Sequence, residues 1–384
     1  MASADLPDVV RLFTDLAALP SPPGSERAVA DYVLAYLRAL GLDVAEDDAG
    51  ARIDSTIGNL YCRLAPEGDG EGTPLFFCAH LDTVPPQGAI EPVEEDGVIR
   101  NGAATILGAD NKAAVAAMLD AVRRLVEERR PHPGVELVLT PKEEVGLQGA
   151  AAFDHGRLRA RVGFVYDHAA PIGEVILGAP YLASLDIRFR GRAAHAGMYP
   201  EEGRSAVAAA ARAVADLRLG RLDDETTANV GVISGGTARN IVPEECSLVA
   251  EARSHDERKL NGLVQEMLDG VTFAAQLAEC DVETSVERHF SGYRFREGDL
   301  PVTLALDALR RAGHEPTLGL SGGGADANVF NERGLQCLNL ANGMAEIHTP
   351  AEHIAAADLE RMVEVTLALI DVARSVDTAR FAGA

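Results

Sequence analysis

Short apolar runs alternate with amphipathic stretches along the first half of the chain. Residues 74–79, 135–140 and 162–166 are apolar at nearly every position, which predicts strands that are buried on both faces of a sheet. Residues 111–129 form a long alanine-rich stretch between two of these runs, which predicts a buried helix. Because strands and helices alternate, we expect an α/β fold in which helices flank the sheet.

The pattern changes near residue 179. Residues 181–191 alternate between apolar and polar positions, as a half-buried strand does. The elements that follow are predicted to be a helix, two strands, a helix and a strand, at residues 203–217, 228–234, 241–253, 256–280 and 281–289. This β-α-β-β-α-β order is that of a ferredoxin-like α+β sandwich. We therefore expect a larger domain in two parts, residues 1–178 and 291–384, with an inserted domain at residues 179–290.

Length, charge and cysteine content narrow the class of protein. A chain of 384 residues is longer than one hydrophobic core usually supports. The net charge of −24 argues against nucleic acid as a partner, because phosphates would be repelled. We find no membrane-length apolar run and no signal-peptide pattern at the N-terminus. Five scattered cysteines without a CxxC pair are typical of a reducing compartment, so we expect a cytoplasmic protein.

Side chains of the kinds that bind metals lie where the predicted strands end. In open α/β sheets, ligands gather outside the carboxyl ends of the strands. Imidazoles and carboxylates occur at three such ends, at the start of the long helix and after the last strand: His80, Glu143 and Glu144, Asp167, Asp110, and His348. Two imidazoles and three carboxylates, one of them from the Glu143/Glu144 pair, suit Zn²⁺, Co²⁺ or Mn²⁺. They suffice for two ions ~3.5–4 Å apart if one carboxylate bridges them.

Each of these residues also has a simpler interpretation. Asp110 alone is well explained as a helix cap. Asp82 lies two residues after His80 and can hold the imidazole ring of a metal ligand, but it can equally form a turn. Glu143 and Glu144 are consecutive and point in different directions, so one can bind a metal while the other acts as a base. The alternative is a pair of solvated acids at a helix start.

Five segments together resemble the M20 metallopeptidases, and within that group the peptidase T, or tripeptidase, branch. The resemblance covers almost the whole chain and implies a zinc-peptidase-type mixed sheet flanked by helices. It also implies that residues 179–290 form a lid or dimerisation domain beside the catalytic domain. The segments are Cys78-Ala-His80-Leu-Asp82-Thr, Leu107-Gly-Ala-Asp110-Asn-Lys, Pro141-Lys-Glu143-Glu144-Val-Gly, Tyr166-Asp167 and Glu346-Ile-His348-Thr-Pro-Ala-Glu352.

The resemblance implies a metal-binding role for five residues. Asp110 would bridge two divalent ions, zinc or alternatively cobalt or manganese, and would precede a cis peptide bond. His80 and Asp167 would complete one site, and Glu144 and His348 would complete the other. The implied function is a dinuclear metal-dependent hydrolase of peptide bonds, most similar to an aminopeptidase that acts on short peptides.

Two further residues of these segments would support the chemistry: Glu143 as the general base and Asp82 as the group that orients the ring of His80. Two departures from the tripeptidase pattern leave the substrate open, namely Asn111, where a second acid is common, and His168 after Asp167. An N-acyl-amino-acid amidohydrolase or a dipeptidase is therefore an alternative. A single-metal hydrolase and a catalytically silent metal-binding protein are also alternatives.

The inserted domain contains the remaining candidate residues. His195 lies in a motif whose histidine helps to polarise the scissile carbonyl, often from a partner subunit, so the resemblance implies a homodimer through the lid. Asn240 and Arg253 lie in motifs that hold the substrate, and arginine suits a carboxylate because of its two-pronged guanidinium group. Gly323, after the insert, lies in a glycine-rich stretch that can present N–H groups to an anion. A surface histidine and a flexible loop are the alternatives for His195 and Gly323.

Overall fold

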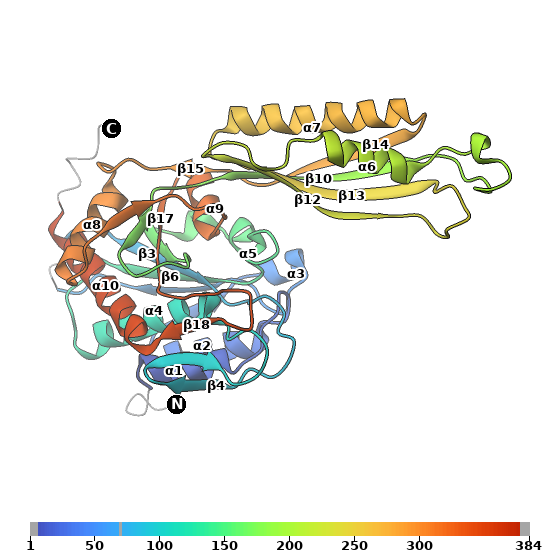
Figure 1. Ribbon diagram of the computed structural model, residues 1–384. Helices are drawn as coiled ribbons and strands as arrows, with labels where there is room; N and C mark the ends of the chain where they lie inside the picture. Colours follow the sequence, from blue (N-terminus) through green and yellow to red (C-terminus); the bar gives the residue numbers. More distant parts are fainter. Residues whose placement is uncertain (1–6, 69–70, 377–384) are drawn as a thin grey trace. The chain divides into compact units, whose positions relative to one another are not determined.

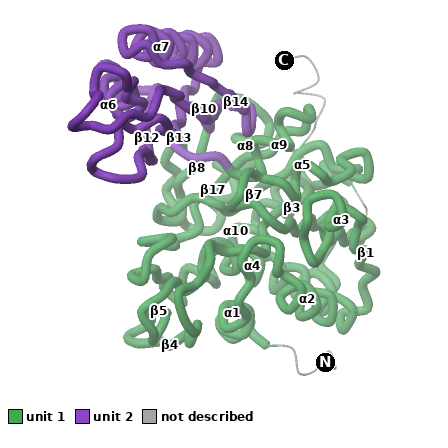
Figure 2. The backbone as a smooth tube through the Cα atoms, turned by 90° about the vertical axis from the view of Figure 1, so that its right-hand side faces the viewer, with its two compact units in different colours: residues 1–178, 294–321, 325–384 green, residues 179–293, 322–324 purple. Residues whose placement is uncertain are grey.

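The computed structural model describes residues 7–68 and 71–376. The middle of the polar turn expected at residues 68–73, and most of the N-terminal stretch in which we expect no signal peptide, lie outside these ranges. The chain divides into two compact units (Figure 2), each with its own hydrophobic core. Unit 1 comprises residues 1–178, 294–321 and 325–384, and unit 2 comprises residues 179–293 and 322–324. No helix among the described residues is long and apolar enough to cross a membrane.

Unit 1 is organised around an eight-stranded mixed sheet with the strand order β1-β2-β6-β3-β7-β17-β8-β16. Neighbouring strands β6, β3, β7 and β17 run parallel, so their carboxyl ends lie at the same edge. Every residue of β3, β6 and β7 is buried, which explains their continuous apolar runs. The strands are β1 (Val44–Glu46), β2 (Leu60–Leu64), β3 (Leu75–His80), β6 (Val135–Thr140), β7 (Val162–Tyr166), β8 (Glu174–Ile176), β16 (Thr317–Gly319) and β17 (Gln336–Leu340).

Helices cover both faces of this sheet (Figure 1). On one face pack α4 (Ala109–Glu127), α8 (Leu300–Arg311) and α10 (Ala356–Ser375), and on the other α5 (Gln148–Ala152) and α9 (Asp326–Glu332). The fold class expected from the sequence, a mixed α/β sheet flanked by helices, is confirmed. Unit 1 also contains α1 (Val9–Ala17), α2 (Arg27–Ala39), α3 (Ala49–Ile53), a one-turn helix at His155–Arg157, and a small sheet of β4 (Pro92–Glu95), β5 (Val98–Asn101) and β18 (His353–Ala355).

Unit 2 is a five-stranded antiparallel sheet with the order β11-β12-β13-β10-β14. Alternate residues of β10 and β13 are buried beneath α6 and α7, while those between them face outward. Apart from the two-residue edge strand β11, the order of elements is the ferredoxin-like one. The elements are β10 (Tyr181–Arg190), a one-turn helix at Pro200–Glu202, α6 (Ala206–Asp216), β11 (Gly220–Arg221), β12 (Thr226–Gly235), β13 (Glu245–Ser254), α7 (Glu257–Leu277) and β14 (Asp281–Phe290); β9 (Gly178–Ala179) pairs with β15 (Tyr293–Arg294).

Several element boundaries differ from those expected, and the reasons are local. The strand expected at residues 241–253 begins only at Glu245, because Pro243 has no N–H to contribute to a sheet. The helix expected from residue 203 begins at Ala206, where the Ser205 side chain accepts a hydrogen bond from the N–H of Ala208 at 3.2 Å. Helix α9 was not predicted, because seven residues are too few for a helical period to be recognised.

Candidate metal centre

The parallel strand ends bring all five predicted ligands together in unit 1. His80 is the last residue of β3, Glu144 and Asp167 follow β6 and β7, Asp110 lies at the start of α4, and His348 lies in the loop after β17. Within the described residues, these five and Glu143 form three overlapping groups, in each of which the ligand atoms lie within 4.8 Å of one another. The groups are His80, Asp110 and Asp167; Asp110, Glu144 and His348; and His80, Glu143 and Glu144.

The carboxylate of Asp110 lies between the two imidazoles. Its Oδ1 is 3.2 Å from Nε2 of His80, and its Oδ2 is 3.2 Å from Nε2 of His348. Nε2 of His348 is also 3.0 Å from Oε1 of Glu144. Nε2 of His80 is also 3.9 Å from Oδ1 of Asp167. Two donor atoms that each lie about 2.1 Å from one tetrahedral ion are about 3.4 Å apart. The separations and the donor types therefore fit two ions that share Asp110.

The backbone at Asp110 does not support its interpretation as a helix cap. Gly108 is the N-cap residue of α4, and no side chain caps this end. Asp110 and Asn111 have non-helical backbone angles (φ −83°, ψ 104° and φ −120°, ψ 26°), and the peptide bond between them is cis, as the resemblance implies. The carboxylate of Asp110 instead faces the two histidines.

The buried acids and the two histidines strongly shift one another's pKa values. Hydrogen bonds to Asp110 and Glu144 raise the pKa of His348 to about 10. Burial lowers the pKa of His80, but Asp110 and Asp167 outweigh it, and the net pKa lies well above the ordinary value. Burial and the nearby charge of Asp110 raise the pKa of Asp167 to about 7. Because two imidazoles do not balance this many carboxylates, the cluster favours divalent cations electrostatically.

Asp82 contacts both His80, a predicted metal ligand, and Glu143, the predicted base. Its carbonyl oxygen is 2.9 Å from Nδ1 of His80, and its carboxylate Oδ1 is 3.5 Å from the same atom. The carboxylate also accepts hydrogen bonds from the N–H groups of Glu143 and Glu144, at 2.9 and 3.1 Å. We expected the contact with the ring but not the contacts with the acid pair. The buried Asp82 therefore ties the ends of β3 and β6 together.

Glu143 has the properties of a proton acceptor held beside the cluster. Its side chain is buried, and burial together with the negative charge of Asp167 raises its pKa well above the usual range, although His80 acts in the opposite direction. A carboxylate with a raised pKa can take up and return a proton near neutral pH.

A buried acid that we did not predict supports the loop before Asp110. Glu352 is 2% exposed, and its Oε2 accepts hydrogen bonds from the N–H groups of Leu107 and Gly108 at 2.8 and 2.9 Å. Its Oε1 accepts one from the N–H of Asp110 at 3.0 Å. The only sequence signal was the position of Glu352 at the end of the segment that contains His348.

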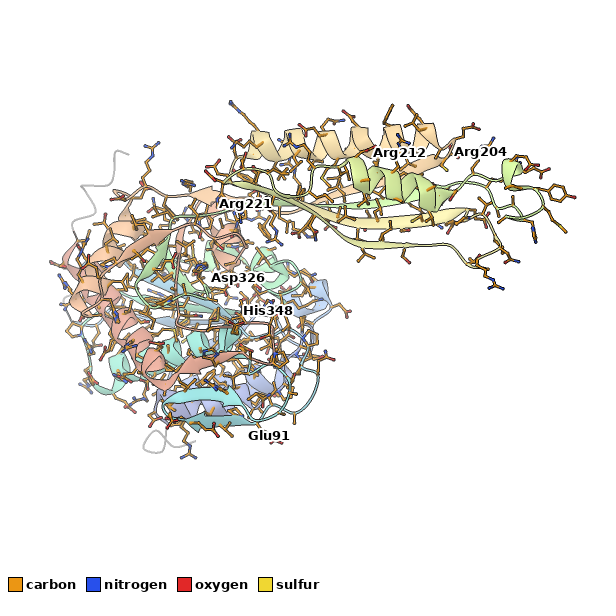
Figure 3. All side chains as sticks on the ribbon, viewed as in Figure 1. Glu91, Arg204, Arg212, Arg221, Asp326 and His348 are labelled. Atoms are coloured by element: carbon orange, nitrogen blue, oxygen red, sulfur yellow. The ribbon has the colours of Figure 1, made fainter. Side chains whose placement is uncertain are left out.

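Two more buried polar residues lie near the cluster. Lys112 is fully buried and donates a hydrogen bond to the carbonyl of Leu19 at 2.5 Å; burial lowers its pKa to about 7, against the opposing charges of Glu352 and Asp82. Asp326, which Figure 3 labels together with His348, accepts a hydrogen bond from the hydroxyl of Thr140. These contacts hold the start of α4 and the end of β6 within the core of unit 1.

The four residues expected to contact substrate all belong to unit 2. His195 is exposed, and its Nδ1 accepts hydrogen bonds from the N–H groups of Gly197 and Met198. Arg253 makes two parallel hydrogen bonds to Glu251, both of 3.0 Å, and a third to the carbonyl of Gly322. The other two are Asn240 and Gly323. The structure thus places these four in one unit and the predicted metal ligands in the other.

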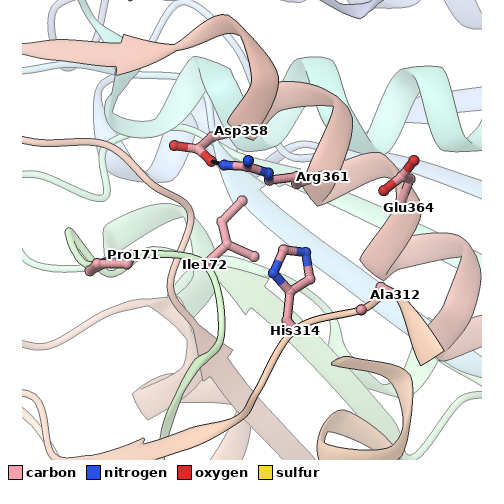
Figure 4. A pocket seen from close by; sticks show the side chains of 8 residues that line it. Pro171, Ile172, Ala312, His314, Asp358, Arg361 and Glu364 are labelled. Carbon is pink, nitrogen blue, oxygen red and sulfur yellow. Dashed lines mark hydrogen bonds and ion pairs between the residues drawn. The ribbon is translucent and has the colours of Figure 1, made fainter. Parts of the chain in front are cut away.

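A pocket on unit 1 contains none of the predicted site residues (Figure 4). Its volume is about 540 Å³, and Arg361 pairs across its wall with Asp358 at 2.6 Å. The remaining lining residues are Pro171, Ile172, Ala312, Gly313, His314 and Glu364. This lining does not reproduce the clustered donor atoms found at the strand ends.

The comparisons with known proteins agree on one family of peptidases. A model of the peptidase family M20/M25/M40 matches residues 76–372. The uncharacterised protein YqjE of Bacillus subtilis is 37% identical over 94% of this chain and 97% of its own length. Among solved structures, the aminopeptidase PepT from Bacillus cereus has a TM-score of 0.87 and 38% identity, covering 95% of this chain and 98% of that chain. A tripeptidase from Staphylococcus aureus has a TM-score of 0.91 and 34% identity, covering 96% and 98%.

Proposed function

The chain belongs to the peptidase family M20/M25/M40, and from that premise we propose that it is a two-metal aminopeptidase of the tripeptidase type, which removes the N-terminal residue from short peptides. The observation that carries this proposal is the position of Asp110, whose two carboxylate oxygens each lie 3.2 Å from a different histidine. The similarity to an aminopeptidase and a tripeptidase over nearly the whole chain supports the substrate class.

The proposal assigns five residues to two divalent ions. His80, Asp110 and Asp167 would hold one ion, and Asp110, Glu144 and His348 would hold the other. Nitrogen and oxygen donors in this ratio suit zinc, with cobalt and manganese as alternatives. When bound, the ions supply Lewis acidity, which polarises the scissile carbonyl and favours deprotonation of the attacking water.

The protein's own groups would position the ligands and move the proton. Because Nδ1 of His80 faces the carbonyl oxygen of Asp82, that nitrogen carries the hydrogen and Nε2 is left to bind an ion. Glu143 would accept the proton of the attacking water and return it to the leaving amine. The hydrogen bond from its N–H to Asp82 fixes the backbone from which its carboxylate extends.

His195 would stabilise the negative charge that develops on the substrate's carbonyl oxygen, and it would do so from the partner in a homodimer formed through unit 2. The proposal can be tested by mixing two inactive variants, Glu143→Gln and His195→Ala. If His195 acts across the dimer, half of the dimers in an equal mixture are mixed and each has one complete site, so about a quarter of wild-type activity returns. A mixture that stays inactive, or a fully active monomer, would exclude action across a dimer.

The cysteines indicate the cell compartment in which the protein acts. All five cysteines are free, and four of them are buried. Unpaired cysteines are typical of proteins in a reducing environment, so we propose that the enzyme acts in the cytoplasm.

A panel of substrates tests the proposed activity directly. The metal-depleted protein receives zinc, manganese or cobalt and is then offered a free tripeptide, the same tripeptide with an acetylated N-terminus, a dipeptide and an N-acyl amino acid. We expect metal-dependent cleavage of the free tripeptide at its first peptide bond and little cleavage of the acetylated peptide. Faster hydrolysis of the N-acyl amino acid would instead indicate an amidohydrolase, and faster hydrolysis of the dipeptide a dipeptidase. Bound metal without hydrolysis of any of these substrates would indicate a silent metal-binding protein.

A further inference from the structure

The carboxylate of Glu352 connects two segments that lie far apart in the sequence. It belongs to the loop that follows β17, four residues after His348, and it accepts three backbone hydrogen bonds from the segment 107–110. Both carboxylate oxygens are used, at distances between 2.8 and 3.0 Å, and the side chain is 2% exposed. Hydrogen bonds to an ionised acceptor are roughly twice as strong as neutral ones.

These three N–H groups lie in the buried, irregular stretch of backbone that leads into α4. Leu107 and Gly108 precede the helix, and Asp110 has non-helical backbone angles. A buried backbone N–H that lacks an acceptor costs free energy, and Glu352 supplies the acceptor for all three groups. Gly108 has a positive φ of 80°, so the chain turns sharply just before Asp110, and Glu352 holds the backbone on both sides of this turn.

We propose that Glu352 is a positioning residue for the metal centre, which holds Asp110 at the correct separation from His348. The proposal rests on the proposed function, because it takes both of these residues as ligands. Nε2 of His348 is 3.2 Å from Oδ2 of Asp110, and the two residues belong to the two segments that Glu352 joins. Without the three hydrogen bonds to Glu352, the distance between Asp110 and His348 could vary. Ligands that must be reordered bind an ion less tightly.

Glu136 provides a matched control, because it is a buried carboxylate that also joins two segments by accepting backbone hydrogen bonds. Its side chain is also 2% exposed, and its carboxylate accepts hydrogen bonds from the N–H groups of Arg159 and Ala160 and from the hydroxyl of Tyr61. It lies near the start of β6, at the opposite end of that strand from Glu143. Removing its charge perturbs a buried backbone clamp of the same kind without touching a segment that contains a predicted ligand.

The test compares Glu352→Gln with Glu136→Gln. Glutamine has the same shape, but its NH₂ group cannot accept a hydrogen bond from a backbone N–H. The readouts are the number of ions per chain, their dissociation constants measured against a competing chelator, and the visible absorption spectrum of the cobalt-loaded protein. For Glu352→Gln we expect at least one ion to bind about 10–100-fold more weakly and an altered cobalt spectrum. Glu136→Gln should keep the wild-type metal affinity and spectrum even if its melting temperature falls.

A second pair of variants keeps the negative charge. Glu352→Asp is one methylene shorter and cannot reach all three N–H groups, so we expect a metal affinity between those of the wild type and Glu352→Gln. Glu136→Asp is its control. If Glu352→Gln does not fold, the affinity and spectrum of Glu352→Asp decide. If both Glu352 variants fail to fold while the Glu136 variants fold, Glu352 is a folding residue and the proposal is overturned.

The outcomes separate this inference from the proposed function. A wild-type protein that binds no metal refutes the proposed function. A wild type that binds metal and hydrolyses peptides, together with a folded Glu352→Gln protein of unchanged affinity and spectrum, refutes only the role of Glu352. Equal loss of affinity in the Glu352 and Glu136 variants would also refute it, because a general loss of stability would then explain the effect.

Discussion

Replacement of Glu143 by glutamine tests the centre of the proposed mechanism. The side chain is buried and the two residues have the same shape, so neither a cavity nor overpacking results. The N–H of Glu143 keeps its hydrogen bond to Asp82, since that bond comes from the backbone. What is lost is the carboxylate whose pKa burial raises, and with it the group that accepts the proton. The expected defect is therefore in catalysis and not in folding or metal binding.

The size of the effect follows from the role assigned to Glu143. A positioned general base contributes about 10²–10⁴-fold to the rate, which corresponds to about 3–5.5 kcal/mol of activation free energy. We expect kcat for a free tripeptide to fall by that factor, while the metal content and the melting temperature stay close to those of the wild type. Metal analysis and thermal unfolding of the same preparation provide the last two measurements.

Glu144→Gln is the matched comparison, because Oε1 of Glu144 lies 3.0 Å from Nε2 of His348. This variant should lose metal, and it should lose activity as a consequence. The reasoning is refuted if Glu143→Gln retains more than about a tenth of the wild-type kcat, because a general base contributes at least about 100-fold. If Glu143→Gln loses an ion and Glu144→Gln does not, the two residues exchange roles.

Three further predictions concern the metal and the stability of unit 1. Chelation should abolish hydrolysis and lower the melting temperature, and added zinc or manganese should restore both; hydrolysis that persists in metal-free protein would contradict the two-metal assignment. The pKa of Glu46 is lowered below its ordinary value of 4.5 by the paired Arg27, so this ion pair stabilises the fold above that pH. Because solvent screens the partly exposed pair, Glu46→Gln should cost about 0.5–1 kcal/mol at pH 7. In urea unfolding, that cost should shrink as the pH falls through the folded-state pKa, and a cost independent of pH would exclude the ion pair as its source. Gly163→Ala would place a methyl carbon 2.2 Å from Cζ of Phe76 and should destabilise the protein by about 1–3 kcal/mol, whereas an unchanged urea midpoint would show that the ring can move aside.

Most of the fold could be predicted because its determinants are periodic in the sequence. The strands β3, β6 and β7 are apolar at nearly every residue since both of their faces are covered. The alternation in β10 and β13 reflects one face covered by helices. Short elements such as α3 and α9 span too few residues to show a period, so the sequence did not predict them.

The donor types of the candidate site could also be predicted, because imidazoles and carboxylates at strand ends are visible as residue types. The contacts that hold them could not. Asp82 and Glu352 accept hydrogen bonds from backbone N–H groups, which nearly every residue possesses, so no side chain in the partner segment signals the contact. Arg253 likewise could not be assigned to Glu251 from the sequence, although the two are only two residues apart.

The α/β class, the ferredoxin-like insert and the chemical nature of the candidate ligands follow from the sequence, because each depends on local period or on residue identity. Which donor atom faces which depends on the tertiary fold. Asp110 and His348 are 238 residues apart, yet their side chains meet at 3.2 Å, and this depends on the parallel order of β6, β3, β7 and β17 and on the backbone angles at Asp110. Distances of this kind arise from the packing of the whole unit, and no single segment of the sequence contains them.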